Sequence, residues 1–246
     1  MSERAPIFLP GVSEERLRAI YGHAAGNEIA SGKFASPQSS AALAANGFGW
    51  FLDRPGDCPL FPALADLGGP VREVAVEREL RLPWSSGRHP WLDAVLWTET
   101  HVIGVESKRY EPFRDPKVAE LSEAYDRDVW GEDMAGWCAM RDLLRADPRR
   151  YKHLDAAQLV KHALGLATEA NRSGLAPVLA YLYAEPQDGA RDPSGFLAHR
   201  REIEDFHAVV AGGRVRFAAC SWRGWLATFA GEASDHAGEV IRVFAP

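Results

Sequence analysis

Hydrophobic and polar positions divide the chain into strand-like and helix-like segments. Two short runs, 91–97 and 101–108, are apolar on both faces, which is typical of strands in the middle of a sheet. The segment 71–83 alternates between apolar and polar residues and predicts a strand before them. Apolar runs at 175–185 and 214–220 predict two later strands. The pattern therefore predicts five strands.

Helical patterns fill most of the remaining chain. The segment 154–174 has marked ends, because Asp155 is a suitable N-cap, Gln158 follows at capping-box spacing and Gly174 lies just beyond the last turn. Ser13, followed by two glutamates, predicts another helix start. The other predicted helices span 13–23, 37–52, 115–125, 134–146 and 194–213, with short helices at 222–230 and 234–244.

The order of these elements sets the fold class. Three consecutive strands with short links favour an antiparallel meander, and later strands that are separated by helices can join it in parallel. The sequence thus predicts an α/β fold with a central mixed sheet flanked by helices.

Charge and cysteine usage narrow the function classes. The net charge of −6 argues against binding nucleic acid over the whole surface but allows a local basic patch. The three cysteines form no C-x-x-C pair, which suits a reducing compartment and argues against a structural zinc site. The N-terminus has no apolar signal segment and no run is long enough for a bilayer, so we expect a cytoplasmic protein without a membrane partner.

Three charged residues lie inside or beside the two most apolar strands. If residues 99–100 form a tight turn, Asp93 lies directly across from Glu106, and Lys108 points to the same face. A register shift by one residue would separate the three groups.

Two opposed carboxylates in an apolar sheet repel each other and do not both stay ionised unless a cation lies between them. Mg²⁺ or Mn²⁺ would satisfy this condition, with Asp93, Glu106, the backbone carbonyl of Ser107 and water as ligands. Lys108 could then stabilise a developing anion or orient a water molecule. A buried salt bridge between Lys108 and one acid is the alternative, and spacing alone does not decide between them.

The arrangement of Asp93 followed by Glu106-Ser107-Lys108 resembles the signature of the PD-(D/E)XK nuclease superfamily, in which an acid on one core strand precedes E-x-K on the next. Leu92 stands where many members have proline. The predicted elements resemble the αβββαβ core of this restriction-endonuclease-like fold. The stretches SSAALAANGFGWFL and GVESKRYEPF are similar to segments of uncharacterised bacterial proteins described as restriction-endonuclease-like.

The resemblance implies a metal-dependent nuclease that hydrolyses phosphodiester bonds in nucleic acid, with DNA as the expected substrate. Asp93 and Glu106 would bind the metal, and Lys108 would position the nucleophile or stabilise the transition state. It also implies one nuclease-like domain over 1–246, with a core at about 28–185 and a C-terminal extension of helix and strand at about 194–246. A homodimer is compatible with this reading.

Four further residues are candidates for supporting roles. Glu28 could help to bind metal, although a solvated loop acid is the favoured interpretation. Glu77, which should share a strand face with Glu79, could be an additional ligand or simply exposed. Gln158 and His162 lie one turn apart on one helix face. They resemble a Gln and Tyr pair near the site in some members, but the capping box explains Gln158 equally well.

Basic residues directly after the E-x-K segment could contact phosphates. Arg109, Arg114 and Lys117 are the candidates, and ordinary solvated charge is the alternative.

Two rival functions remain open at this level. The first is a noncatalytic binding or scaffold module with the nuclease fold in a defence or repair system. The second is a hydrolase that uses a general acid and base carboxylate pair, as in glycosidases, which would leave Lys108 without a role and would work in the presence of a chelator.

Overall fold

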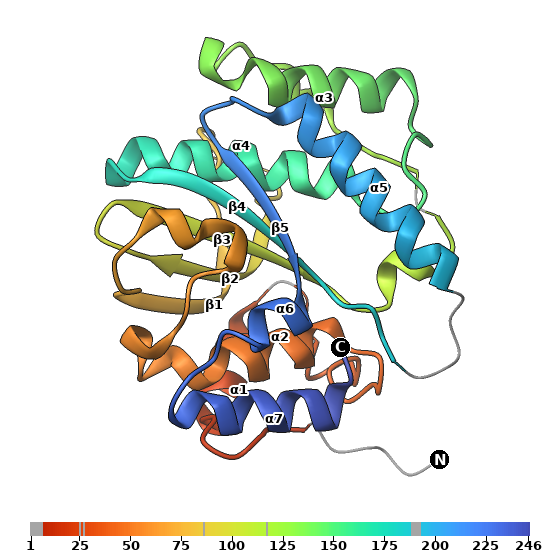
Figure 1. Ribbon diagram of the computed structural model, residues 1–246. Coiled ribbons are helices and arrows are strands. Elements are labelled where there is room, and N and C mark those ends of the chain that lie inside the picture. The colour runs from red at the N-terminus through yellow and green to blue at the C-terminus, as the bar shows by residue number, and fades with distance from the viewer. Residues whose placement is uncertain (1–6, 25, 27, 86, 117, 188–192) are drawn as a thin grey trace.

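A five-stranded mixed sheet forms the centre of the computed structural model (Figure 1). The structure describes residues 7–24, 26, 28–85, 87–116, 118–187 and 193–246. The strands are β1 (Glu73–Glu79), β2 (Trp91–Trp97), β3 (His101–Lys108), β4 (Ala176–Tyr183) and β5 (Arg216–Ser221), and they lie in chain order across the sheet. The first three strands are antiparallel, and β3, β4 and β5 are parallel. The predicted strands and the change of direction are confirmed.

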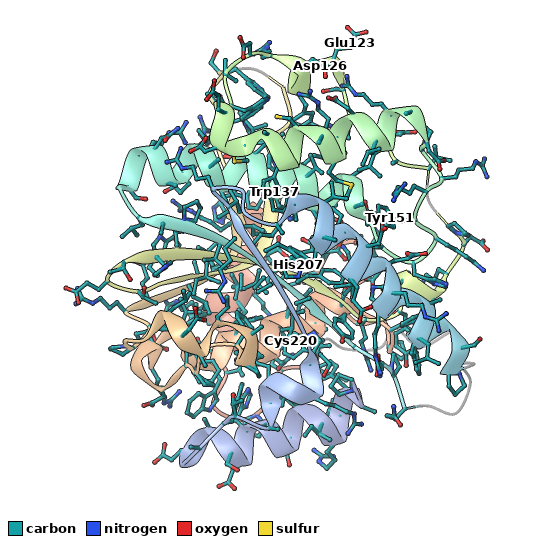
Figure 2. All side chains as sticks on the ribbon, turned by 45° about the horizontal axis from the view of Figure 1, so that its top comes forward. Glu123, Asp126, Trp137, Tyr151, His207 and Cys220 are labelled. Carbon is teal, nitrogen blue, oxygen red and sulfur yellow. The ribbon has the colours of Figure 1, made fainter. Side chains whose placement is uncertain are left out.

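Helices cover both faces of the sheet and give each face its own apolar core (Figure 1). One layer contains α1 (Glu14–His23), α2 (Ser40–Gly49), α6 (Trp222–Leu226) and α7 (Glu232–Phe244). The other contains α3 (Ala135–Ala146), α4 (Ala156–Ser173) and α5 (Pro193–Val210), with Trp137 and Tyr151 among its buried aromatic residues (Figure 2). Short 3-10 segments span Trp50–Leu52, Pro55–Asp57, Pro62–Leu67, Glu111–Phe113, Glu123–Asp126 and Glu132–Met134.

The hairpin between β2 and β3 has the predicted register. Val95 lies opposite Gly104, Trp97 lies opposite Val102, and the Thr98 amide donates to the His101 carbonyl across a two-residue turn. The length of this turn fixes the register, and continuous apolar sequence buries both strands on both faces.

Close contact with α4 requires glycine at two positions. A side chain at Gly104 would come within 2.5 Å of Leu92 and 2.8 Å of Leu166, which fill that space. On α4 itself, a side chain at Gly165 would come within 2.9 Å of Leu80. The two glycines therefore let α4 lie close against β2 and β3, so residues in its first turns are held above the end of β3.

Local capping chemistry determines several helix starts. The side chains of Ser13, Ser39 and Asp155 accept hydrogen bonds from the backbone of the first turns of α1, α2 and α4. Gly174 adopts a φ of 73° just beyond α4, as predicted for its C-terminal end.

Two predicted elements were wrong in part. The segment 115–125 contains no α-helix in its described residues, and only the 3-10 segment at Glu123–Asp126 reaches into it. Its backbone instead bonds to other elements: the Ala119 amide donates to the Pro148 carbonyl, and Arg145 donates to the carbonyls of Leu121 and Ser122. The first strand ends at Glu79 rather than near residue 83.

Within the described ranges, no helix is both long enough and apolar enough to cross a membrane.

Candidate active site

Three carboxylates lie side by side on three neighbouring strands. Glu77 falls opposite Asp93 in the register of β1 and β2, between the Val76–Ala94 and Arg78–Leu92 pairs. Asp93 directly precedes the last β2–β3 pair, Ala94–Val105, and its Oδ2 accepts a hydrogen bond from the amide of Ser107, the residue after Glu106. All three line one open pocket of about 660 Å³, together with Lys108 and Gln158. The structure thus brings together the predicted pair and adds the lower-ranked candidate Glu77.

The backbone is irregular where these acids lie. Glu77 has a φ of 49°, in the left-handed region that costs a non-glycine residue about 1–2 kcal/mol. In β2, Leu92 and Val95 belong to the same core, although three residues apart in a regular strand would place them on opposite faces. Sparsely populated backbone conformations are concentrated at functional sites, where the surrounding structure maintains them.

This irregularity corrects one expectation. Glu77 and Glu79 were expected to share a strand face, but Glu77 lines the pocket and Glu79 pairs with Arg81 at 3.3 Å. The left-handed residue interrupts the alternation on which the expectation depended.

Glu106 and Lys108 form a buried ion pair. The exposed fraction is 2% for the Glu106 side chain and 13% for that of Lys108. Burial opposes ionisation of Glu106, but the charge of Lys108, together with the neighbouring His162, outweighs it and lowers the pKa of Glu106 to about 2. Burial also opposes the charge on Lys108, yet the carboxylates of Glu106 and Asp93 raise its pKa above the ordinary value. The pair is therefore fully charged at neutral pH.

Asp93, in contrast to Glu106, has a raised pKa. Burial and the charge of Glu106 raise its pKa well above the ordinary value, although Lys108 and a hydrogen bond from the Ser107 amide act against them. That amide donates to Asp93 Oδ2 over 2.6 Å. The site thus holds more carboxylates than its neighbouring cations neutralise, and Asp93 ionises with difficulty.

Helix α4 supplies the second wall of the site. Gln158 Oε1 accepts a hydrogen bond of 2.8 Å from Lys108 Nζ, and His162 Nδ1 lies 3.1 Å from Glu106 Oε2. The second pair does not form a well-aligned hydrogen bond, and neither of its two atoms has another hydrogen-bond partner in the described chain.

The two interpretations of Gln158, capping box and site residue, can now be compared. Its backbone N–H donates to the Asp155 cap, whereas its side chain contacts Lys108. One helix therefore positions both polar members of the E-x-K segment through residues four apart.

Glu28 is a partly exposed acid between α1 and α2, which agrees with the favoured interpretation as a solvated loop acid. It also lines the same pocket, and its charge contributes to the raised pKa of Glu77.

Pattern reasoning missed two other residues, Tyr21 and Glu111. The Tyr21 hydroxyl interacts with Glu77, and its own pKa is raised well above normal by burial and by the carboxylates. Glu111 accepts hydrogen bonds from the Ser40 hydroxyl and the Arg109 amide. Its position three residues after Lys108 was the only available signal.

The basic residues after the E-x-K segment differ in position and exposure. Arg109 is only 4% exposed and donates to the carbonyls of Pro37 and Phe244, so its predicted phosphate contact is wrong. Arg114 is exposed at the rim of the pocket, where Lys33 is also found. Lys117 lies outside the described residues.

The donor set fits a hard divalent cation through few protein ligands. Among the described residues, no group of three or more His, Cys, Asp or Glu side chains is arranged to hold a metal ion. Mg²⁺, however, is commonly held by one or two carboxylates, with water and substrate phosphates completing its shell. Glu106 Oε2 is buried without a hydrogen-bond partner, and the raised pKa of Asp93 reflects its burial among other carboxylates. Asp93 and Glu106 are therefore suitable ligands, and the Ser107 carbonyl remains an expectation.

Comparison with models of protein families, with characterised proteins and with solved structures gave no significant match. The site must therefore be interpreted from its own chemistry.

Glu77 should make folding stability depend on pH. Burial and the charges of Glu106 and Glu28 raise its pKa from 4.5 to about 7. A carboxyl with a higher pKa in the folded protein stabilises the fold below its unfolded pKa, and this contribution is lost as the pH rises through the folded pKa. We expect urea unfolding to show stability falling between about pH 4.5 and pH 7, by up to about 1.4 kcal/mol per pH unit for this one group.

Glu77→Gln should make the decrease of stability with pH less steep. The remaining slope should come from Asp93, whose pKa is also raised. Glu79→Gln on the same strand is the matched control and should keep the wild-type slope. An identical slope for Glu77→Gln and wild type would contradict the assignment.

Proposed function

We propose that the protein is a metal-dependent nuclease that hydrolyses phosphodiester bonds, with DNA as the expected substrate. One observation carries the proposal: Glu77, Asp93, Glu106 and Lys108 converge from three adjacent strands in one open pocket. Buried acids with opposite pKa shifts beside a charged lysine are typical of catalytic sites rather than of structural ion pairs alone.

The order of elements supports the same proposal. The elements α2, β1, β2, β3, α4 and β4, with α3 as an addition between β3 and α4, fit the αβββαβ order of the restriction-endonuclease-like core. The candidate residues lie where β1, β2 and β3 pair and where α4 covers β3, as the PD-(D/E)XK resemblance implies. The chain would then form one nuclease-like domain.

The residues have distinct chemical tasks under this proposal. Asp93 and Glu106 would bind Mg²⁺ or Mn²⁺, which when bound would neutralise phosphate charge and acidify a water molecule. Because burial and the charge of Glu106 oppose the ionisation of Asp93, cation binding should lower the pKa of Asp93 and favour its charged form.

Lys108 is held ready to contact the reacting phosphate. Its ammonium group has three N–H donors, and Glu106 and Gln158 account for two of them. The remaining donor can stabilise negative charge that develops on a phosphate oxygen, and the two fixed partners reduce the reorganisation that this requires. Arg114 and Lys33 at the rim can contact neighbouring phosphates.

A nuclease assay tests the proposal directly. Plasmid, linear and single-stranded DNA and RNA are incubated with Mg²⁺, with Mn²⁺ and with EDTA, and Asp93→Asn protein purified in the same way serves as control. We expect cleavage only with a divalent cation and only by the wild type. Cleavage that persists in EDTA would favour the carboxylate-pair hydrolase, and binding without any cleavage would favour the noncatalytic module.

A further inference from the structure

A second concave surface lies beside the candidate active site. It is formed by the connection between β1 and β2, by the segment around Tyr125 and by one residue of α4, and it has a volume of about 540 Å³. We call it the Trp84 pocket, after its central aromatic residue. Its charged and aromatic lining residues are Trp84, Arg88, Tyr125, Arg127 and Lys161.

The cations of the Trp84 pocket are not neutralised by carboxylates. In the described part of the chain, Arg88, Arg127 and Lys161 form no ion pair with an acid. Arginines elsewhere on the surface are commonly paired, as Arg150 is with Asp205. A local concentration of unpaired positive charge on a protein of net charge −6 indicates an anionic ligand.

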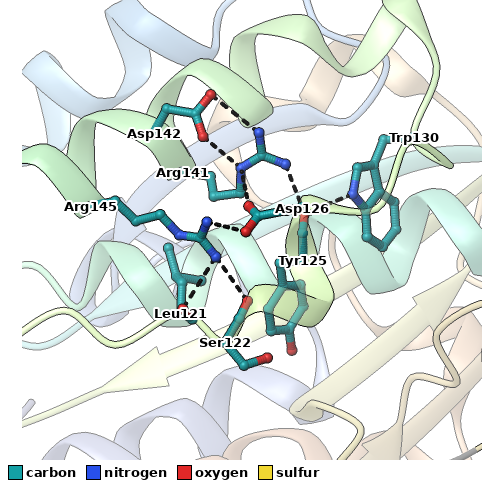
Figure 3. Close-up of polar contacts among 8 residues, drawn as sticks. All are labelled: Leu121, Ser122, Tyr125, Asp126, Trp130, Arg141, Asp142 and Arg145. Carbon is teal, nitrogen blue, oxygen red and sulfur yellow. Dashed lines mark hydrogen bonds and ion pairs between the residues drawn. The ribbon is translucent and has the colours of Figure 1, made fainter.

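The acids nearest in sequence do not cancel this charge. Asp126 directly precedes Arg127, but it pairs with Arg145 and, at 3.5 Å, with Arg141 (Figure 3). Glu123 and Asp128 are exposed and do not line the pocket.

The wall of the pocket is fixed in place by hydrogen bonds. The Tyr125 carbonyl accepts from Trp130 over 3.1 Å and from Arg141 over 2.7 Å, and Arg145 donates to the Ser122 carbonyl over 2.9 Å (Figure 3). The guanidinium group of Arg127 lies 4.7 Å from the centre of the Trp84 ring. This stacked pair presents a flat cationic surface that a nucleobase can extend and a phosphate can contact.

Two short connections join the Trp84 pocket to the candidate active site. Pro90 lines the first pocket, and the next residue, Trp91, lines the second. On α4, Lys161 lines the Trp84 pocket and Gln158, three residues earlier, lines the active-site pocket. Residues three apart on a helix are neighbours, with Cβ atoms about 5–6 Å apart. A strand bound at one pocket can therefore continue into the other.

We propose that the Trp84 pocket binds a single-stranded flank of the nucleic acid substrate, with a base against the Trp84–Arg127 pair and phosphates on Arg88, Arg127 and Lys161. This inference rests on the proposed nuclease function for the strand's path but requires only binding. A single strand is favoured over a duplex because a flexible chain can enter a concave pocket and present an unstacked base.

The test measures binding without cleavage. Fluorescence anisotropy of a labelled single-stranded DNA, long enough to span both pockets, is followed in EDTA over a series of salt concentrations. The combined variant Arg88→Ala/Arg127→Ala/Lys161→Ala should weaken binding by tenfold or more at low salt. It should also reduce the slope of log K against log salt by about 2, since each phosphate contact on a single strand contributes about 0.7.

The matched control is Arg149→Ala/Arg201→Ala/Arg223→Ala, which removes three exposed arginines with the same change in net charge. An equal loss of affinity in this control would show that the net charge of the protein, and not the Trp84 pocket, determines binding, and would overturn the proposal. Wild-type affinity in the pocket variant, or no binding of single strands by the wild type, would also overturn it.

A second probe tests the base contact. An abasic strand of the same length has the same phosphates, and we expect the wild type to bind it about fivefold or more weakly, with this difference reduced in Trp84→Leu. Blunt duplex DNA that binds as tightly as the single strand, with the same loss in the pocket variant, would refute the single-strand assignment.

Cleavage of the same strand is measured separately in Mg²⁺. Cleavage by the wild type with unchanged binding in the pocket variant would leave the nuclease function standing and remove the inference. Loss of binding in the pocket variant, with no cleavage by the wild type, would support the inference about the Trp84 pocket and count against the nuclease function.

Discussion

Replacing Asp93 with asparagine is expected to abolish metal-dependent cleavage, with a loss of about a thousandfold or more. The change removes one of two proposed carboxylate ligands, and its effect should equal or exceed the loss of one preorganised group from a catalytic site. Folding should not suffer, because Asp93 ionises with difficulty in its buried position and asparagine can still accept the hydrogen bond from the Ser107 amide. Initial cleavage rates and urea unfolding at neutral pH measure the two effects.

Calorimetry with and without Mg²⁺ tests independently whether Asp93 binds the metal. A ligand at one hundred times its dissociation constant stabilises the folded state by about 2.7 kcal/mol, so the melting temperature of the wild type should rise with Mg²⁺. The melting temperature of Asp93→Asn should stay constant. Cleavage at the wild-type rate by Asp93→Asn, or an equal Mg²⁺ response in both proteins, would show that Asp93 does not bind the metal.

Lys108→Ala is expected to lower both stability and activity. Removal of the lysine leaves the Glu106 carboxylate, which is 2% exposed, with only its 3.1 Å contact to His162. Breaking a buried ion pair in this way costs about 3–5 kcal/mol. The loss should be largest at neutral pH and smaller in acid, because Glu106 without its lysine can bind a proton and become neutral. Urea unfolding at several pH values follows this change.

A second variant isolates the contribution of Lys108 to stability. In Lys108→Ala/Glu106→Gln the stranded charge is absent, so most of the lost stability should return, while cleavage stays absent because a proposed metal ligand is also removed. Lys152→Ala, which removes an exposed lysine, should behave as wild type in unfolding. Full stability of the single variant Lys108→Ala would show that the ion pair contributes little to the fold.

The charges beside the central strands thus form an organised group rather than isolated polar residues in an apolar sheet. Glu106 and Lys108 compensate each other, and Gln158 and His162 fix them from α4. Asp93 and Glu77 remain under-compensated, which is the property that a cation-binding site requires.

Much of the fold could be derived from the sequence because the deciding interactions are local or periodic. Apolar residues on both faces of 91–97 and 101–108 require central strands, and the two-residue link between β2 and β3 then fixes Val95 opposite Gly104. The Asp155 cap and Gly174 similarly define the ends of α4, since both signals lie within one turn of the helix they terminate. Strand alternation and turn length also predict that Asp93 and Glu106 lie close together, and both residues line one pocket.

Only the tertiary structure decided how other residues take part. The left-handed conformation of Glu77 has no glycine or asparagine to signal it, and it depends on the packing around β1. The sequence suggested two roles for Gln158, and contact with Lys108, fifty positions away, selected between them. Arg109 resembled a phosphate ligand until the carbonyls of Pro37 and Phe244 proved to be its partners. These outcomes depend on which distant segments come together, and periodicity and local propensity contain no information about that.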